Sequence, residues 1–589
     1  MKIKLLLLAV VLTAHSSFSQ NEFITTWETT TPNETITIPT TGTGYNYDVD
    51  WENDSTFDDV GVMGNITHTY AAPGIYTVAI RGNFPRIYFN NSGDKHKIKS
   101  ILQWGNIVWA SMHRAFDGCN YLEVRASDAP NLANVTDASF MFRCTLFTQP
   151  TVTWLSINHW DVSSVINMRG MFQNQQHFNL PLNSWDVSNV TNMSYMFDLA
   201  HRFNQPLNSW DVSSVVNMNG MFNGANFFNQ PIGNWIVSSV TNMGLMFQNA
   251  QFFNQPLNNW DVSSVTDMHV MFSNSAFNEP IDSWNVANVT NMSFMFSRNS
   301  VFNQPLDSWD VSSVTNMSYM FWDTTSFNQP INSWDVSNVQ NMTYLFNNAQ
   351  NFNQPLNSWD VSNVYTMYGT FQGSMSFNRR LGAWNVNNVT DMTSMFQGAT
   401  SFNQPLGNWD VSNVTNMSNM FNGATGFDQT LGVWDVSSVT IMSNMFLNVK
   451  LSTVNYDNTL INWDALNLQP NVSFHGGLSQ YCNAASQRTN MINNDGWVIV
   501  DGGQTICPPL NISDEESIKF AVYPNPVETN FSIESTKTID QLTIYNLQGH
   551  RVKRYKSQNQ YDISDLSSGI YFINIKTSKG ETTKKLIKK

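Results

Sequence analysis

The sequence predicts an α/β solenoid of coils about 25 residues long, each with a short strand and a short helix, flanked by two small all-β sandwich domains. Three observations lead to this fold. Tryptophan returns at a fixed interval through the middle of the 589-residue chain. Each interval ends in the pattern V-x-x-M-x-x-M-F. Residues 21–97, before the repeats, instead alternate threonine, isoleucine, valine and tyrosine, as strands do.

The tryptophan interval defines the repeat. A fixed period in the twenties is typical of a solenoid, in which each unit buries its apolar face only against its neighbours. Two degenerate copies of the repeat, which we call worn copies, precede the regular units: "WGNIVWASMHRAF" and "NLANVTDASFMF". Atypical end copies are expected as caps. The regular tryptophans are 25 residues apart, with one step of 24: Trp160, Trp185, Trp210, Trp235, Trp260, Trp284, Trp309, Trp334, Trp359, Trp384, Trp409 and Trp434.

The two halves of each unit predict different elements. Val165, Met168, Met171 and Phe172 are spaced by three and four residues, which places them on one face of a short helix. The front of the unit, F-N-x-P-[LI]-x-x-W, contains proline and is too short for a helix, so it predicts a turn and a brief extended segment. One strand and one helix in a coil of about 25 residues is the leucine-rich-repeat plan.

The methionine, valine and phenylalanine columns predict the core. Of the 28 methionines, 22 fall in two columns of the twelve units. Methionine fills irregular interior gaps, so we interpret these columns as packing and not as a cofactor or substrate site. A surface row of tryptophans would suit sugar or protein binding, but the column is in phase with its apolar neighbours, which favours an inward position. The structural columns include Trp160, Trp185, Trp210, Met193, Met218, Phe197 and Phe222.

An aspartate follows almost every tryptophan, as Asp186 and Asp211 do. The same column accepts asparagine at 285 and 385 and isoleucine at Ile236, which a catalytic carboxylate or an essential calcium ligand would not tolerate. Aspartate and asparagine both accept hydrogen bonds from backbone N–H groups just ahead of them. We therefore interpret the column as a structural turn, and the asparagines at 179, 204 and 229 as an internal ladder.

Composition and motifs argue against several functions. The formal net charge is −15, whereas nucleic-acid binders carry basic patches, so no nucleic-acid partner is expected. No phosphate loop, zinc spacing or nucleophile elbow occurs, so we predict no catalytic residues, no cofactor and no metal. The nearest enzymatic rival is a polysaccharide-cutting β-helix. It would need a non-repeated charged cluster, and Arg298, Arg379 and Arg380 are too scattered to form one.

The N-terminus and the cysteines indicate export. Residues 1–19 carry Lys2 and Lys4, an apolar run and a small-x-small cleavage site, as a signal peptide does. No later stretch is apolar enough to span a membrane. Export permits disulfides, and the cysteines form two close pairs, Cys119 with Cys144 and Cys482 with Cys507. Four cysteines allow three pairings, and buried free thiols are the alternative for the first pair.

Residues 98–503 resemble the BspA-like leucine-rich-repeat surface proteins of bacteria. The resemblance is carried by the recurring word in "NSWDVSNVTNMSYMF" and by the closing segment that begins "YDNTLINWDALNLQPNVSFHGG". It implies an extracellular binding or adhesion protein. The stretch "YDVDWENDS…HTYAAPGIYTVAI" resembles an immunoglobulin-like domain of the PKD type, although that type usually has W-x-D-G where this chain has "WEND".

The C-terminal segment resembles the sorting domain of type IX secretion cargo. Its sign of charge differs from that of the repeats: residues 519–589 carry 12 lysines and arginines against 6 acidic residues, and residues 160–446 carry 5 against 17. The resemblance implies the type IX secretion machinery as a partner and a bacterium of the Bacteroidota type. The matching residues are Tyr523, Pro524, Asn525, Pro526, Gly569 and Tyr571.

These features predict a secreted or outer-surface protein that binds extracellular protein or glycan. The alternative is a polysaccharide-acting protein, either a lyase-like enzyme or a sugar-binding accessory. A non-repeated acidic and basic pocket would favour the enzyme, and an exposed aromatic row the accessory. The expected parts are a signal peptide (1–19), a PKD-like β domain (20–97), the solenoid (98–450), its C-terminal cap (451–503), a linker (504–518) and the sorting domain (519–589).

Overall fold

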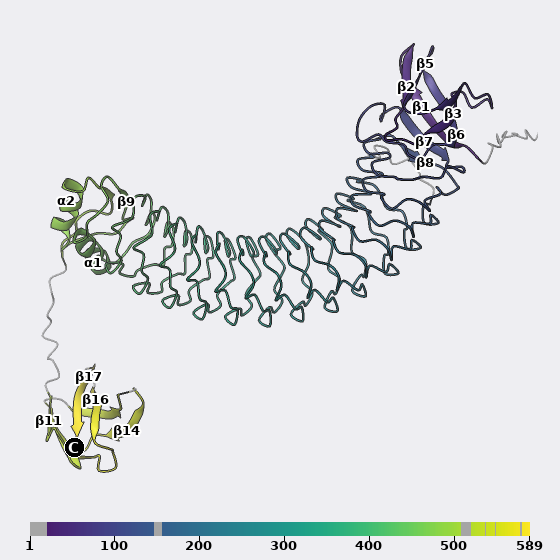
Figure 1. Ribbon diagram of the computed structural model, residues 1–589. Helices are drawn as coiled ribbons and strands as arrows, with labels where there is room; N and C mark the ends of the chain where they lie inside the picture. The colour runs from purple at the N-terminus through teal and green to yellow at the C-terminus, as the bar shows by residue number, and fades with distance from the viewer. Residues whose placement is uncertain (1–20, 146–155, 508–519, 536–537, 548, 578–579) are drawn as a thin grey trace, which may run out of the picture. The chain divides into compact units, whose positions relative to one another are not determined.

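The computed structural model describes residues 21–145, 156–507, 520–535, 538–547, 549–577 and 580–589 (Figure 1). The predicted signal peptide, residues 146–155 and most of the predicted linker lie outside these ranges. The chain divides into two compact units, Met1–Gln504 and Thr505–Lys589.

The first unit begins with a six-stranded sheet in the order β4-β3-β6-β1-β7-β8 and a two-stranded sheet of β2 and β5. The strands are β1 (Phe23–Thr29), β2 (Glu34–Ile38), β3 (Asn46–Asp50), β4 (Asp59–Val62), β5 (Ile66–Tyr70), β6 (Gly74–Asn83), β7 (Ile98–Gln103) and β8 (Glu123–Val124).

The N-terminal sheet continues directly into the first coil. Strand β7 pairs antiparallel with β1 and parallel with β8, which belongs to the first worn repeat. One hydrophobic core runs without a break from Phe23 through the coils to Ile499. The N-terminal sheet therefore closes the end of the solenoid and shields its first coil from water.

The described residues of the repeats contain no helix, so the predicted α/β class with one helix in each coil is wrong. The only helices among the described residues are α1 (Thr453–Asp464) and α2 (Ala485–Asn493), both after the repeats. Two residues in each ladder segment have positive φ, for example Tyr195 (58°) and Leu199 (57°), and a right-handed helix cannot contain them. The spacing of three residues between the apolar positions comes from consecutive tight turns. Each turn is closed by a hydrogen bond from a backbone N–H to the carbonyl three residues earlier.

Backbone N–H groups alternate between two kinds of partner along the segment 193–199. The N–H groups of Met193, Tyr195, Phe197 and Leu199 donate to carbonyls of the next coil at 2.7–3.0 Å, while those of Met196 and Asp198 donate within their own coil. Each coil thus satisfies its buried backbone groups with the help of its neighbour. We call this part of every coil the ladder segment; the isolated parallel bridges between Asn192 and its equivalents lie at its start.

The tryptophan column lies inside the coils, as the inward interpretation expects. Trp185 and Trp210 are each only 3% exposed, and Phe197 and Phe222 are completely buried. The indole Nε1 of Trp210 donates to the carbonyl of Leu182 in the preceding coil at 2.9 Å, and the equivalent bond recurs through the array. Met193 and Met218 are also fully buried. The aromatic and methionine columns therefore form one continuous interior stack.

The spacing between coils changes across the coil. Seven pairs of neighbouring tryptophan rings lie nearly parallel with their centroids 6.3–6.5 Å apart. The rings of the Phe222 column are 5.5–5.9 Å apart. Strands joined by backbone hydrogen bonds lie closer still, at about 4.8 Å. The coils are thus closest at the ladder segments, which places these on the inner side of the bend that Figure 1 shows in the row of coils.

The C-terminal cap continues the stack with longer elements. Strand β9 (Ser473–His475) pairs in parallel with β10 (Val498–Val500). Trp463 of α1 still donates its indole N–H to the carbonyl of Leu431, as the repeat tryptophans do. The carboxylate of Asp457 accepts the backbone N–H groups of Cys482, Asn483 and Ala484 just before α2. The cap therefore buries the last coil, and Asp457 provides hydrogen-bond acceptors for the backbone N–H groups just before α2.

The cysteine predictions have different outcomes. Cys482 and Cys507 are disulfide-bonded, which confirms the second pair. Cys119 and Cys144 are free thiols, so the first disulfide is wrong and the alternative holds. The two residues occupy different positions of the coil: Cys119 follows Phe116 by three residues and is buried, whereas Cys144 follows Phe142 by two and takes a positive φ of 59°. Their side chains therefore belong to different columns.

The second unit contains two antiparallel sheets, ordered β11-β12-β15 and β14-β13-β16-β17. Its own core includes Phe531, Leu542 and Ile573, all fully buried. The strands are β11 (Phe520–Tyr523), β12 (Asn530–Ser535), β13 (Ile539–Tyr545), β14 (Arg551–Lys556), β15 (Tyr561–Asp562), β16 (Gly569–Thr577) and β17 (Gly580–Lys588). In the described part of the chain, no helix is long and apolar enough to cross a membrane.

Candidate binding face

The exposed side chains of the ladder segments form a surface that we call the ladder face. They come from four positions of the coil: the one after the first methionine, the one before the second methionine, and the two after the phenylalanine. Not every coil exposes all four, and Ser194 and Asp198 are buried. These positions vary from coil to coil, while the Trp and Phe columns do not and the Met columns change only at Leu345 and Thr370. Side chains at positions that are not fixed by the repeat can recognise a ligand, and these positions lie on the ladder face.

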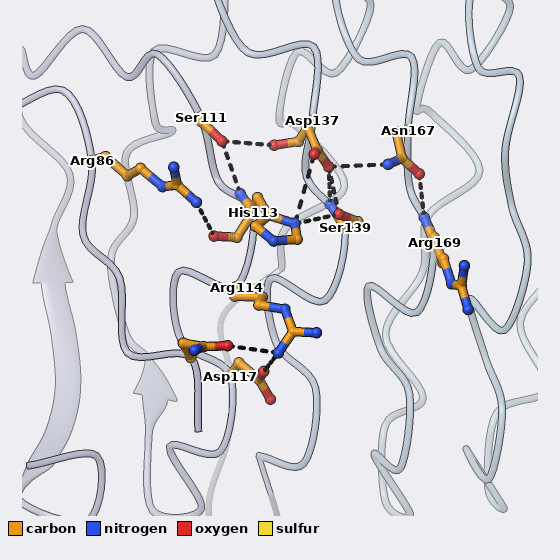
Figure 2. Close-up of polar contacts among 10 residues, drawn as sticks. Arg86, Ser111, His113, Arg114, Asp117, Asp137, Ser139, Asn167 and Arg169 are labelled. Carbon is orange, nitrogen blue, oxygen red and sulfur yellow. Dashed lines mark hydrogen bonds and ion pairs between the residues drawn. The ribbon is translucent and has the colours of Figure 1, made fainter. Parts of the chain in front are cut away.

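A basic cluster occupies the N-terminal end of the ladder face, and Figure 2 labels its residues except Arg143. Successive ladder segments supply its residues, and Arg86 joins them from the loop that stacks on the first coil, where its Nη2 donates to the carbonyl of His113 at 3.2 Å. The cluster consists of Arg86, His113, Arg114, Arg143 and Arg169.

Phe140 is the centre of this cluster. The guanidinium carbons of Arg114, Arg143 and Arg169 lie 5.1, 4.8 and 5.7 Å from its ring centroid. A cation over an aromatic ring is attracted by the ring quadrupole, so Phe140 holds the three arginines together. The ring also lies over Gly170 of the next coil, where an added Cβ would come within 2.5 Å of it.

Asp117 is the acidic partner of the cluster. It is fully buried, and Arg143 binds it with two hydrogen bonds, Nε to Oδ1 at 2.9 Å and Nη2 to Oδ2 at 2.8 Å. Arg114 approaches the same carboxylate at 3.5 Å. The hydrogen bonds that Arg143 donates to Asp117 raise the pKa of Arg143 above its ordinary value. This two-point contact fixes the direction of the Arg143 guanidinium.

Ser139, His113 and Asp137 meet beside the cluster but do not form a catalytic triad. Ser139 Oγ lies 2.6 Å from His113 Nδ1, and Asp137 Oδ2 approaches the same nitrogen at 3.6 Å. Ser139 also donates to Asp137 at 2.5 Å. A triad needs the serine and the carboxylate on opposite ring nitrogens. Burial lowers the pKa of His113 below its ordinary value, which favours the neutral ring near neutral pH.

An aromatic row occupies the central part of the ladder face. Phe294 and Tyr319 stack with centroids 4.3 Å apart, Tyr344 follows Tyr319 at 5.0 Å, and Tyr368 follows Tyr344 at 4.9 Å. These rings are partly exposed. Burial raises the pKa of Tyr319 above its ordinary value.

Trp322 extends this row sideways. Its ring meets Tyr319 edge-on at 5.6 Å, and the guanidinium carbon of Arg298 lies 4.3 Å from its centroid. We use the name aromatic row for Phe294, Arg298, Tyr319, Trp322, Tyr344 and Tyr368.

Sequence reasoning missed both groups. It treated Arg298 as an isolated departure from the repeat and did not compare the worn copies position by position with the regular ones. The signal was present, because Arg114, Phe140 and Tyr319 all stand two residues before the column phenylalanine. Reading the variable positions as columns would have placed the two groups on one face.

The aspartate column performs the turn role that the sequence predicts. Asp186 Oδ1 accepts the backbone N–H of Ser188 at 3.1 Å and its hydroxyl at 2.7 Å. These hydrogen bonds lower the pKa of Asp186 below its ordinary value, and the bond from the hydroxyl has the larger effect. The pKa of Asp211 is also lowered, mainly by hydrogen bonds from Ser213. Ile236, which interrupts the column, is 61% exposed, as an outward turn position permits. The asparagine ladder joins neighbouring coils: Asn204 N–H donates to Asn179 Oδ1 at 2.9 Å.

The aspartate turns predict a loss of stability in acid. A carboxyl whose pKa is lowered by folding stabilises the fold above its unfolded-state pKa, and this contribution disappears as the pH falls through the folded-state pKa. We expect thermal stability to fall as the pH drops below the ordinary aspartate value of 3.8. A variant with asparagine at Asp186, Asp211 and Asp261 should change stability near neutral pH by less than about 0.5 kcal/mol per site. Thermal melting across the acid range should show a smaller fall for this variant, and an equal fall would contradict the turn mechanism.

One group of acidic residues has the spacing of metal ligands. Among the described residues, carboxylate oxygens of Asp50, Glu52 and Asp58 lie within 4.8 Å of one another. Asp50 already accepts the backbone N–H groups of Asp54 and Ser55, and Asp58 accepts that of Trp51. These bonds shape the turn after β3, and we assign no metal to the group.

The residues of the predicted sorting motif lie at one edge of the second unit. Asn525 Nδ2 donates to the carbonyl of Lys585 at 2.9 Å, and Asn525 Oδ1 accepts the N–H of Ile587 at 2.8 Å. Tyr571 is mostly buried, and its hydroxyl donates to the carbonyl of Ser567. Tyr523, Pro524, Pro526 and Gly569 are exposed. The motif thus clamps the C-terminal strand β17 and leaves a proline-rich surface in solvent.

Comparison with known families gives two matches. The family model described as "Mycoplasma protein of unknown function, DUF285" matches residues 110–214, 145–260, 251–359 and 344–463. Together these stretches span residues 110–463, which is 354 of the 589 residues. The model described as "Secretion system C-terminal sorting domain" matches residues 521–589. No curated protein matches the chain.

Proposed function

Since the chain belongs to the DUF285 repeat family and ends in a type IX secretion sorting domain, we propose that it is an extracellular binding protein whose ligand docks on the ladder face. The sorting domain directs the protein to the outer cell surface or beyond it. The ligand is a protein or glycan outside the cell, and the protein acts in adhesion. The resemblance of the repeats to BspA-like surface proteins supports this role.

The observation that carries the proposal is the aromatic row. Binding surfaces are enriched in tryptophan, tyrosine and arginine, because these side chains bury large areas and still offer polar contacts. Trp322, Tyr319 and Arg298 meet on one partly exposed patch. None of them belongs to a repeated column, so the packing of the solenoid does not require them.

The position of the row also supports binding. The ladder face follows the inner side of the bend, and solenoids use such extended concave surfaces to hold their ligands. Neighbouring coils present their side chains about 4.8 Å apart along this face. A long ligand can therefore contact many coils at once, which suits adhesion.

We favour binding over catalysis for the same face. In the basic cluster, Asp117 is buried under two arginines, and Asp137 accepts hydrogen bonds from Ser139 and Asn167. These contacts hold the acidic groups in structural roles. A lyase-like enzyme would need a free base and an acid poised on opposite sides of a substrate. Release of unsaturated sugar ends from a polysaccharide by the purified protein would overturn this preference.

The first test measures binding with and without the aromatic row. The secreted protein is applied to an array of glycans and extracellular-matrix proteins, together with a variant that combines Tyr319→Ala and Trp322→Ala. We expect the variant to lose at least tenfold in affinity for the ligand found, because truncating a hot-spot residue costs about 2 kcal/mol or more.

The matched control is Phe252→Ala. Phe227 and Phe252 form another exposed stacked pair, at 5.3 Å, outside the ladder segments. This variant should bind like the unaltered protein. Equal loss in both variants, or a ligand insensitive to Tyr319 and Trp322, would show that the ladder face is not the binding surface.

A further inference from the structure

The basic cluster contrasts with the rest of the repeats. The chain has a formal net charge of −15, and residues 176–446 contain only four arginines and no lysine. Four arginines nevertheless gather at one end of the ladder face. We infer that the basic cluster is a subsite for the carboxylate or sulfate groups of an acidic polysaccharide. This inference rests on the proposed function, because it assigns a ligand class to one part of the same face.

The cluster holds more positive charge than its own acids balance. Arg143 and Arg169 lie 4.8 and 5.7 Å from the centroid of Phe140, so their guanidinium carbons are at most 10.5 Å apart (4.8 + 5.7). This upper bound is slightly above the Debye length of about 8 Å in physiological salt, so solvent screens their repulsion only in part. Asp117 is the one carboxylate bound to Arg114 and Arg143. An external anion would remove the remaining repulsion.

Two arginines keep unused donors. In the described ranges no hydrogen bond or ion pair reaches the guanidinium of Arg169, and Figure 2 shows it apart from the other polar groups drawn. The Nε of Arg86 is buried without a partner, where no external ligand reaches it, but the Nη1 of the same guanidinium also has no partner among the described residues and is not buried. A buried donor without a partner costs free energy. An arginine fork matches the planar oxygens of a carboxylate or sulfate.

The cluster is also rigid before any ligand arrives. Arg143 is fixed by its two bonds to buried Asp117, and Arg114 Nη1 donates to Asn90 Oδ1 at 2.6 Å. Arg169 is held between the rings of Phe140 and Tyr195. Preorganised donors lose less side-chain entropy on binding than free ones.

The surface beside the cluster favours a polysaccharide over an acidic protein. Asn192 and Asn217 use their Oδ1 atoms inside the coil, and their Nδ2 groups have no acceptor among the described residues. Ser194 and Asn219 beside them are buried, and their side chains bond to Asn192 and Asn242. Amide donors at the same position of neighbouring coils suit a polymer with repeated hydroxyls, whereas the core of a protein interface is richer in apolar groups.

The test measures binding of the full secreted protein to polymers of different charge. Polygalacturonate presents carboxylates, heparin presents sulfates, and dextran is neutral. We expect at least one of the two anionic polymers to bind, more weakly as salt increases, and dextran to bind much less. Arg169→Gln and Arg86→Gln should each weaken that binding about tenfold, because a charge-assisted hydrogen bond contributes about 1.5–3 kcal/mol.

The matched control is Arg380→Gln, an exposed arginine far along the sequence. It removes the same charge and should change binding by less than about twofold. Arg169→Gln should lower the melting temperature only slightly, since that guanidinium has no polar partner in the fold and loses only its contacts with the rings of Phe140 and Tyr195. An equal loss in all three variants would show general charge attraction and overturn the subsite.

Two further outcomes separate this inference from the proposed function. If dextran binds as tightly as both acidic polymers, the acidic-polysaccharide subsite is overturned and the aromatic-row test stays intact. The same holds if polyglutamate or DNA binds as tightly as the acidic polymers and with the same dependence on Arg169. An array ligand whose binding depends on Tyr319 and Trp322, together with no binding of either anionic polymer, would also overturn the subsite and leave the proposed function intact. Loss of all array binding would remove both proposals.

Discussion

Replacing Trp210 with alanine is expected to destabilise the solenoid by about 3–5 kcal/mol, the usual cost of truncating a large buried aromatic residue. The substitution removes an indole that is 3% exposed and leaves a cavity between coils. It also removes the hydrogen bond from Nε1 to the carbonyl of Leu182, which then stays buried without that partner. Denaturant unfolding of the secreted protein, followed by tryptophan fluorescence and circular dichroism, measures the loss.

Trp322→Ala is the control for this substitution. It removes the same side chain from a partly exposed position that belongs to no core column. We expect its effect on unfolding to be below about 1 kcal/mol, in the range of surface substitutions. A loss at Trp210 no larger than that at Trp322 would contradict an interior role for the column.

Deleting residues 521–589 is expected to stop export across the outer membrane. The segment matches a secretion sorting domain and folds around its own core, separate from that of the repeats. The truncated protein should accumulate in the periplasm with an intact solenoid, since the coils are closed by their own C-terminal cap. Cell fractionation with antibodies to the repeats measures where the protein lies.

A milder variant tests whether the secretion machinery recognises the folded sorting domain. Asn525→Ala removes both bonds that clamp β17, to the carbonyl of Lys585 and from the N–H of Ile587. It should reduce export, whereas Phe252→Ala in the repeats should not. Equal amounts of the truncated and full-length proteins outside the cell would show that the tail is not required.

The repeat columns show how far sequence reasoning reaches. The burial of Trp185, Met193 and Phe197 follows from their fixed phase, because positions that pack against the next coil must stay apolar. The aspartate turn is equally predictable, since its contacts reach only two residues ahead. The helix was wrong because a spacing of three also arises from consecutive turns. Positive φ at Tyr195 and Leu199 decides between the two.

The sequence by itself determined the number of regular coils, the residues inside them, the aspartate turns, and the route of export. Each of these depends on local spacing or on a contiguous motif. Only the tertiary structure decided where the backbone N–H groups bond, because a bond to the next coil competes with a helical bond only once the coils are stacked. The same stacking adds Arg86, from outside the repeats, to the basic cluster, so the complete cluster was visible only in the folded protein, although the variable columns could have placed its other residues on one face.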